Sequence, residues 1–157
     1  MEGNDKMTKI FITSDHHFFH GNIIKYCNRP FKNYKEMNEC LIERWNATVG
    51  KNDIVFHLGD FAWRGKAKEI RERLNGTIIL VKGNHDKFVV AEDGFIVIEG
   101  NLIIGRLILS HEPLSARLIP KGYKNVHGHI HDKTSYIGLN VSVERTDYKP
   151  ILLENCL

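Results

Sequence analysis

One pattern recurs along this chain and restricts its fold more than any other feature: a short apolar run ends in aspartate, asparagine or histidine. Residues 77–81 form such a run, and Gly83-Asn84-His85-Asp86 follows it after a single lysine. Apolar runs of roughly 4–8 residues bounded by glycine are typical of short buried strands. The other runs, residues 10–14, 54–58, 107–110 and 123–126, lead into Asp15-His16-His17, Gly59-Asp60, His111 and Gly128-His129-Ile130-His131.

Strands stacked in one sheet deliver the residues at their carboxyl ends to a single edge, where α/β proteins usually bind ligands. We therefore expect the polar side chains that follow these runs to lie together. They are carboxylates, imidazoles and one amide, a mixture that suits divalent transition-metal ions. The candidate ligands are Asp15, His17, Asp60, Asn84, His111, His129 and His131.

The spacing of these residues separates the predicted site from a helical metal site. His129 and His131 are two positions apart, as are Asp15 and His17, and such pairs share one face of an extended strand. The His-x-x-x-His spacing of a zincin helix does not fit. No thiolate belongs to the set, so the donors suit Mn²⁺, the metal we expect, and equally iron, Zn²⁺, Co²⁺ or Ni²⁺.

The order of elements predicts the layers. Strands are expected at residues 9–14, 53–58 and 77–81, with helices at 22–28, 33–50 and 66–74. Asn33 and Glu36 have the spacing of a capping box at the start of the second helix. Residues 94–110 read as a meander with a hairpin turn at Gly100-Asn101, and residues 139–143 and 150–153 as closing strands. This succession predicts two sheets packed face to face with helices outside.

In chain order, the motifs resemble those of the calcineurin-like metallophosphoesterases, from Asp15 to His131. The resemblance implies a four-layer α/β/β/α sandwich of two mixed β-sheets flanked by helices. It also implies two divalent metal ions, and hydrolysis of a phosphodiester or phosphomonoester by a metal-bridging hydroxide. The compact chain leaves little room for a cap domain, which favours a small or exposed phosphodiester as substrate.

The resemblance also assigns roles to residues. Asp60 would bridge the two ions, and the other ligands would divide into two triads: Asp15, His17 and His131, and Asn84, His111 and His129. His85 would serve the leaving group or the phosphoryl charge and would not ligate metal. Asp86 would hydrogen-bond the second nitrogen of the His85 ring and so orient the imidazole.

Other polar residues near these motifs have less specific signals. His20, Asn22 and Arg64 are candidates for substrate contact because they follow the first two motifs. A single histidine beside an apolar strand is more often a hydrogen-bonded structural residue, and we interpret His57 and His127 in this way. His16 fits either interpretation.

Composition limits the function classes. The 157 residues, 42% hydrophobic and 26% charged, indicate a single globular domain over residues 1–157, with residues 1–8 as a disordered tail. A net charge of +3 without a basic stripe favours a small phosphoester, such as a nucleotide, over long nucleic acid. No apolar segment has the length of a membrane span or of a signal sequence. Three widely spaced cysteines indicate a reduced, cytoplasmic protein.

Two alternatives stay open beside the phosphoesterase. One is a metal-dependent nuclease that uses the same site. The other is a binding module that keeps the fold without the chemistry; it predicts lost ligands or a replaced His85, and both are present here. The oligomeric state has no signal in the sequence.

Overall fold

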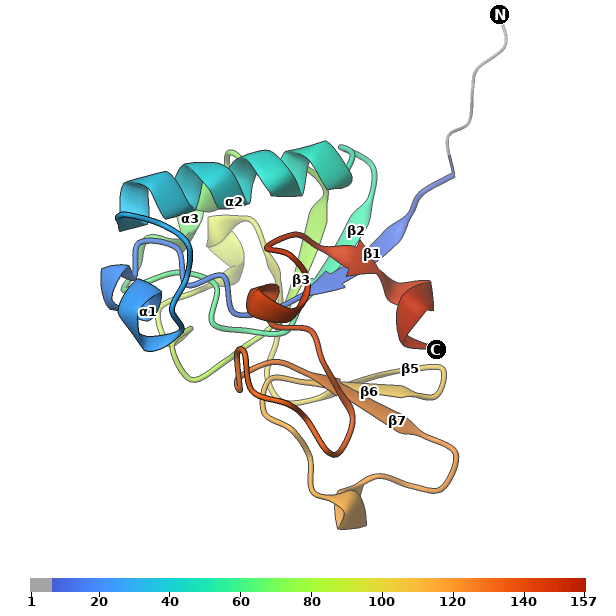
Figure 1. The fold of residues 1–157 in the computed structure, drawn as a ribbon. Helices are drawn as coiled ribbons and strands as arrows, with labels where there is room; N and C mark the ends of the chain where they lie inside the picture. Colours follow the sequence, from blue (N-terminus) through green and yellow to red (C-terminus); the bar gives the residue numbers. More distant parts are fainter. Residues whose placement is uncertain (1–6) are drawn as a thin grey trace, which may run out of the picture.

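A computed structural model describes residues 7–157, and two β-sheets make up its centre (Figure 1). The first sheet has the strand order β4-β3-β2-β1-β9 and the second has the order β5-β6-β7-β8. Both sheets combine parallel and antiparallel pairs, so the predicted α/β architecture of two mixed sheets with flanking helices is confirmed. The expected tail, residues 1–8, lies outside the described residues except for Met7 and Thr8, which are exposed.

The first sheet brings the predicted strand ends level with one another. Its members are β1 (Ile10–Thr13), β2 (Ile54–His57), β3 (Thr77–Val81), β4 (Ile96–Ile98) and β9 (Ile151–Leu152). Strands β1 to β4 run parallel, with Thr13 opposite His57 and His57 opposite Leu80. Their carboxyl ends therefore open on the same edge, while β9 pairs antiparallel with β1.

The three α-helices are α1 (Gly21–Tyr26), α2 (Tyr34–Thr48) and α3 (Ala67–Arg71). All three contribute side chains to the core on one side of the first sheet, and α1 lies beyond the carboxyl end of β1 (Figure 1). Helix α2 begins where predicted, because the Asn33 side chain accepts hydrogen bonds from the N–H groups of Lys35 and Glu36, each at 3.0 Å. The Glu36 carboxylate accepts from Lys32 N–H, so the predicted capping box closes one residue early. None of the helices among residues 7–157 has the length and apolar character needed to cross a bilayer.

The second sheet contains β5 (Leu102–Ile104), β6 (Leu107–Ser110), β7 (Lys124–His127) and β8 (Leu139–Asn140). The hairpin predicted at Gly100-Asn101 is wrong. β4 pairs with β3 in the first sheet, and the chain crosses at Gly100 to start the second sheet. The antiparallel hairpin joins β5 and β6 through Gly105-Arg106. A Gly-Asn turn marks a change of direction, and the pairing of the strands beyond it depends on the packing of the two sheets.

Two hydrophobic cores hold these layers together. Alternate residues of β1 point to opposite sides: Phe11 packs in the core under the helices, and Ile12 packs in the core between the sheets. Burying each such side chain stabilises the fold by about 1.5–3 kcal/mol. The remaining helices are short 3₁₀ turns: η1 (Ala91–Asp93), η2 (Ala116–Leu118), η3 (Val143–Arg145) and η4 (Leu153–Cys156).

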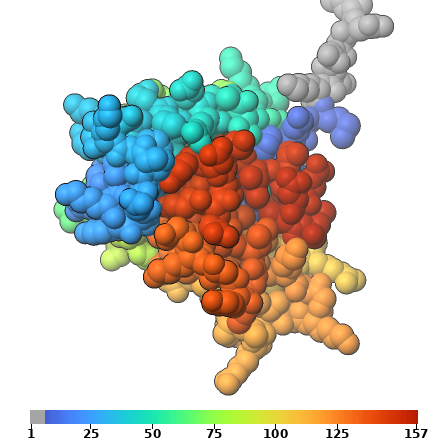
Figure 2. Space-filling view, in the orientation of Figure 1, coloured from blue at the N-terminus to red at the C-terminus, as the bar shows by residue number. Residues whose placement is uncertain are grey.

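Segments from the two ends of the chain lie against each other. Figure 2 shows the red and orange C-terminal part in contact with blue and cyan N-terminal residues. An isolated bridge between Ser14 and Ser142 joins them next to the end of β1. Near this bridge, His129 N–H donates to the Asp15 carboxylate at 2.8 Å, so the turns that contain Asp15 and His129 are adjacent.

Candidate metal centre

The turns after the strands have an unusual backbone. Asp15, His17, Asp60, His129 and His131 all have positive φ angles, from 51° to 69°. A residue with a side chain pays about 1–3 kcal/mol for such a conformation, and these conformations cluster at functional sites. The extended strand predicted for His129 and His131 is therefore wrong. Each of the two residues has a left-handed backbone conformation. The side chain of His131 lies with Asp15 and His17, and that of His129 lies with Asp60 and His111.

Motif glycines let these turns approach one another. A Cβ atom on Gly83 would collide with the Asp60 carboxylate and lie 2.7 Å from Asp60 N, and one on Gly128 would collide with Ser14 and Asp15. Hydrogen bonds then tie the turns: Asp15 N–H donates to the Gly59 carbonyl at 3.0 Å. Close backbone contact thus brings side chains from separate strands together.

The first candidate ligand group is Asp15, His17 and His131, whose ligand atoms lie within 4.8 Å of one another. Asp15 Oδ1 and His17 Nε2 are 4.0 Å apart, and both are buried without a hydrogen-bond partner among the described residues. Leaving buried polar atoms unpartnered is costly. A divalent cation between them would satisfy both atoms, so the donors fit a metal. The other oxygen, Asp15 Oδ2, accepts from His129 N–H at 2.8 Å and Ser142 Oγ at 2.9 Å.

The second group is Asp60, His111 and His129, also within 4.8 Å. His111 Nδ1–H donates to the Leu58 carbonyl at 2.7 Å, so Nε2 is the ring nitrogen that faces the other members of the group. Asn84 Oδ1 lies 3.0 Å from His111 Nε2, so the predicted amide ligand joins this group. The structure thus brings together all seven residues that the sequence analysis selected.

Asp60 stands between the two groups. Its Oδ2 atom is 3.4 Å from His17 Nε2 in the first group and 3.4 Å from His111 Nε2 in the second. Burial raises the pKa of Asp60, but the imidazoles of His111 and His17 beside its carboxylate outweigh burial and hold that pKa well below its usual range. Burial lowers the pKa of His111, but the hydrogen bond and the charge of Asp60 outweigh it and raise that pKa to about 9. Bound cations would take the place of such protons.

His85 lies beside both groups and belongs to neither. The residue is exposed, and its ring centre is 5.2 Å from that of His17 and 5.9 Å from that of Trp63. This place, at the open side of the ligands, is accessible to a substrate.

Asp86 has a different partner from the one predicted. Its fully buried carboxylate accepts hydrogen bonds from the N–H groups of Asp60 at 2.7 Å, Gly83 at 2.7 Å and Phe61 at 2.9 Å. The predicted contact with the His85 ring is therefore corrected. Because its oxygens point back into the turn, Asp86 fastens the turn after β3 to the turn after β2.

Of the three candidates for substrate contact, His20 and Arg64 lie against Trp63 and Asn22 lies apart from them. The His20 ring stacks on Trp63, with ring centres 4.1 Å apart and planes at 18°. Arg64 lies over the same Trp63 ring, 5.0 Å from its centre. Asn22 is exposed on α1 and lines neither of the cavities next to His85. Trp63 was missed because an isolated tryptophan in a loop has no distinctive pattern.

The histidines interpreted as structural do bond locally. His57 Nε2 lies 2.9 Å from His16 Nδ1 in a buried pair, and burial lowers the pKa of His57 to about 3. His127 Nε2 bonds Ser135 Oγ at 2.8 Å. The local bonding predicted for His57 and His127 is confirmed, and His16 is fully buried with its ring stacked on Phe18.

Arg29 was also missed, although it supports the first ligand group. Its buried guanidinium donates to the carbonyl of Asp15 at 2.6 Å and to that of His16 at 2.7 Å. Only the buried environment distinguishes this arginine, since in the sequence it is one basic residue before a proline. A third cluster, Cys27, His131 and Glu144, shares His131 with the first group.

Two cavities of about 410 Å³ each meet at His85. One is lined by Trp63, Arg64, Asn84, His85, Lys87 and Phe88, and we name it the Trp63–Phe88 cavity. The other, named the Tyr26–Lys133 cavity, contains His17, His20, Tyr26, His129, His131 and Lys133 beside His85. Each cavity therefore reaches candidate ligands and His85.

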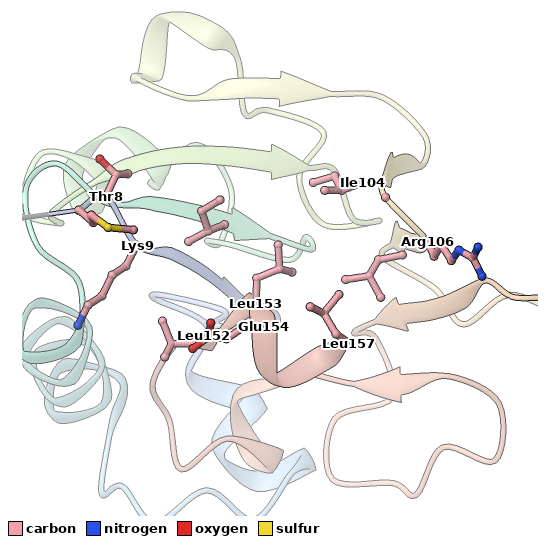
Figure 3. A pocket seen from close by; sticks show the side chains of 12 residues that line it. Thr8, Lys9, Ile104, Arg106, Leu152, Leu153, Glu154 and Leu157 are labelled. Carbon is pink, nitrogen blue, oxygen red and sulfur yellow. The ribbon is translucent and has the colours of Figure 1, made fainter.

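A larger cavity, of about 630 Å³, lies elsewhere, at the end of the sandwich where β1 begins (Figure 3). Leucine and isoleucine side chains such as Ile104, Leu152 and Leu153 line it, with Arg106 and Glu154 among its charged residues. No candidate ligand reaches this cavity, so its size does not mark the metal centre.

Comparisons with known proteins agree with this geometry. A family model described as calcineurin-like phosphoesterase matches residues 8–155. An uncharacterised protein of Methanocaldococcus jannaschii is 44% identical, covering 94% of this chain and 89% of the relative. A solved protein of unknown function from Aquifex aeolicus is 28% identical with a TM-score of 0.76, over 95% of this chain and 97% of its own.

A nuclease from Pseudomonas putida is 22% identical with a TM-score of 0.53, over 78% of this chain and 60% of the nuclease. That likeness concerns the fold alone. The family match, by contrast, spans nearly the whole chain and includes every strand end that contributes a candidate ligand. The protein belongs to the calcineurin-like phosphoesterase family.

Proposed function

We propose that the protein is a phosphodiesterase with two divalent metal ions, Mn²⁺ in the first instance. The observation that carries the proposal is the position of Asp60 Oδ2, 3.4 Å from His17 Nε2 and 3.4 Å from His111 Nε2. One carboxylate oxygen between two ligand groups suits a bridging role. Two ions in such a site supply a hydroxide nucleophile and compensate the charge on the phosphoryl oxygens.

In this proposal, named residues have metal-binding and orienting roles. Asp15, His17 and His131 would hold one ion, Asn84, His111 and His129 would hold the other, and Asp60 lies between the two groups. Ser142 and the backbone of His129 orient Asp15 so that its Oδ1 atom faces the ligand group. His111 is held as a ligand by its bond to the Leu58 carbonyl.

His85 is assigned to the leaving group. It is exposed beside the ligand groups and outside them, so its imidazole is free to donate a proton to the departing oxygen. General acid catalysis of this kind contributes about 10²–10⁴-fold to the rate.

A diester is preferred to a monoester because two cavities meet at His85. The phosphorus of a diester has two organic substituents, and one cavity is available for each. A monoester would leave one of the cavities unused. We also propose that residues 1–157 are a single domain, and that the protein is cytoplasmic, which its three free cysteines support.

The test is hydrolysis of bis-p-nitrophenyl phosphate and p-nitrophenyl phosphate after chelation and addition of Mn²⁺, Zn²⁺, Co²⁺, Ni²⁺ or iron. We expect metal-dependent activity, greater on the diester, that is lost in Asp60→Asn. Glu92→Gln, which changes an exposed carboxylate outside both cavities, is the matched control. Absence of hydrolysis with every metal would favour the binding-module alternative.

A further inference from the structure

We propose that the Trp63–Phe88 cavity is a leaving-group subsite for a nucleotide, that is, for an aromatic ring joined to a second negative charge. The inference rests on the proposed phosphodiesterase activity and adds the substrate class. Three features carry it: the position of the cavity beside His85, its aromatic walls, and its uncompensated cations.

The position of the cavity relates it to the departing group. His85 and Asn84 line it together, so it begins where the proposed proton donor and one proposed ligand meet. In hydrolysis the oxygen of water bonds to phosphorus while the bond from phosphorus to the leaving oxygen breaks. The attacking water loses a proton to solvent, while the leaving oxygen takes a proton from His85 and departs as an alcohol; His85 then regains a proton from solvent. A group that receives this proton must occupy the side of the phosphorus that faces His85.

The walls of the cavity are aromatic. The Trp63 ring is held in place by the stacked His20 ring, 4.1 Å away, and lies 5.9 Å from the His85 ring. Phe88 is 64% exposed. A single exposed aromatic residue is ordinary on a protein surface. Here the exposed Phe88 and the fixed Trp63 line one cavity together with the proposed general acid, an arrangement that suits a planar ring.

The charges of the cavity indicate an anionic ligand. Arg64 has a positive φ of 33°, and its guanidinium lies 5.0 Å from the centre of the Trp63 ring. Across residues 7–157 neither Arg64 nor Lys87 has a carboxylate partner, whereas Arg44 and Arg73 each pair with one. An aromatic wall with two unpaired cations complements a nucleobase and an additional phosphate.

The experiment uses the Mn²⁺-loaded protein with three substrates: a 5′-phosphorylated dinucleotide, a single-stranded oligonucleotide of the same bases, and bis-p-nitrophenyl phosphate. We expect Trp63→Ala and Phe88→Ala to raise KM for the dinucleotide by about 10- to 100-fold. Trp63→Phe, which keeps an aromatic ring, should have a KM for the dinucleotide close to that of the wild type. Arg64→Gln and Lys87→Gln should raise KM by about 2- to 5-fold, and by less on bis-p-nitrophenyl phosphate, which lacks the second charge.

Binding provides a readout that is independent of turnover. Calorimetry should show that AMP binds the wild-type protein more tightly than adenosine or ribose 5-phosphate does, and that Trp63→Ala removes the advantage over ribose 5-phosphate. Matched controls are Tyr136→Ala, a 96% exposed aromatic residue, and Lys149→Gln, an exposed lysine, both outside the cavity. Neither control should change KM or AMP affinity.

The outcomes separate the two proposals. If the wild-type protein hydrolyses no phosphodiester, the proposed function fails. If it hydrolyses bis-p-nitrophenyl phosphate while the cavity variants keep wild-type KM values and AMP affinity, the subsite alone is refuted. A higher kcat/KM on the dinucleotide identifies small nucleotides as the source of the leaving group, and a higher value on the oligonucleotide identifies nucleic-acid strands.

Discussion

Arg29 and Glu144 form a buried ion pair across 115 positions of sequence, with Arg29 Nε donating to Glu144 Oε1 at 2.9 Å. The same carboxylate oxygen lies 3.1 Å from His131 Nδ1. Because Arg29 also binds the carbonyls of Asp15 and His16, one guanidinium connects the turn after β1 to the carboxylate beside His131. The pair therefore supports two of the three residues in the first ligand group.

Replacing Glu144 should weaken metal binding. A carboxylate behind a metal-ligating histidine fixes the ring and raises its basicity, and loss of such a partner typically costs about 10- to 100-fold in affinity. We expect Glu144→Gln to lower Mn²⁺ affinity by about that factor, measured by calorimetry on folded protein. It should also lower the free energy of unfolding, since Arg29 loses its buried partner.

Asp147→Asn is the control for this variant. Asp147 pairs with Arg44 at 3.0 Å, but its side chain is 74% exposed. Removal of an exposed pair costs at most about 1 kcal/mol and should leave Mn²⁺ affinity unchanged. Equal Mn²⁺ affinity in wild type and Glu144→Gln would show that Glu144 does not position His131.

Asp60 should determine the metal stoichiometry. We expect elemental analysis of the Mn²⁺-replete protein to find two ions per chain, and fewer in Asp60→Asn, because one carboxylate contacts both ligand groups. A single tightly held ion, with the same content in Asp60→Asn, would contradict the bridging role.

Metal should stabilise the folded chain. Asp15 Oδ1 and His17 Nε2 are buried and have no hydrogen-bond partner among the described residues, so a bound cation would offset the free-energy cost of burying them. We expect chelator to lower the melting temperature and Mn²⁺ to restore it. Mn²⁺ at about 100 times its Kd should raise the free energy of unfolding by about 2.7 kcal/mol. A melting temperature that does not respond to saturating metal would count against the assigned ligands.

His85 separates chemistry from metal binding. His85→Ala should retain both metal ions, because His85 belongs to neither ligand group, while the chemical step slows by about 10²–10⁴-fold for alkoxide leaving groups. Nitrophenolate departs without a proton, so the rate of nitrophenyl ester hydrolysis should decrease least in His85→Ala. The measurement compares rate constants of wild type and His85→Ala on substrates whose leaving groups differ in pKa. Metal content is determined in parallel. An equal loss for all leaving groups would assign His85 to the phosphoryl charge instead.

Asp86 should behave differently from His85. Its carboxylate accepts three backbone hydrogen bonds, so Asp86→Asn should lower the free energy of unfolding by about 1.5–3 kcal/mol for each bond lost. Urea denaturation measures the effect. Asp93→Asn is the control, since Asp93 accepts one exposed backbone bond from Val90. A rate loss that depends on leaving-group pKa, without loss of stability, would restore Asp86 as the partner of His85.

Much of the site follows from the sequence because each motif is local. An apolar run followed by Gly59-Asp60 or Gly83-Asn84 contains, within a few residues, both the strand and the side chains at its end. Parallel pairing of β1, β2 and β3 then brings those ends to one edge. The amino-acid sequence by itself therefore determines which seven residues are candidate ligands, and it predicts the two-sheet architecture.

The tertiary structure decided the backbone conformations, strand pairings and side-chain contacts that involve residues far apart in the sequence. The left-handed backbone at His129 and His131 occurs where Gly128 lies close to Ser14 and Asp15, more than a hundred residues earlier. Packing also placed β4 beside β3, and turned the Asp86 carboxylate toward backbone N–H groups. The Arg29–Glu144 pair exists only because the C-terminal segment lies against the first turns. Local backbone preferences act over a few residues, whereas these contacts form only when the sheets pack.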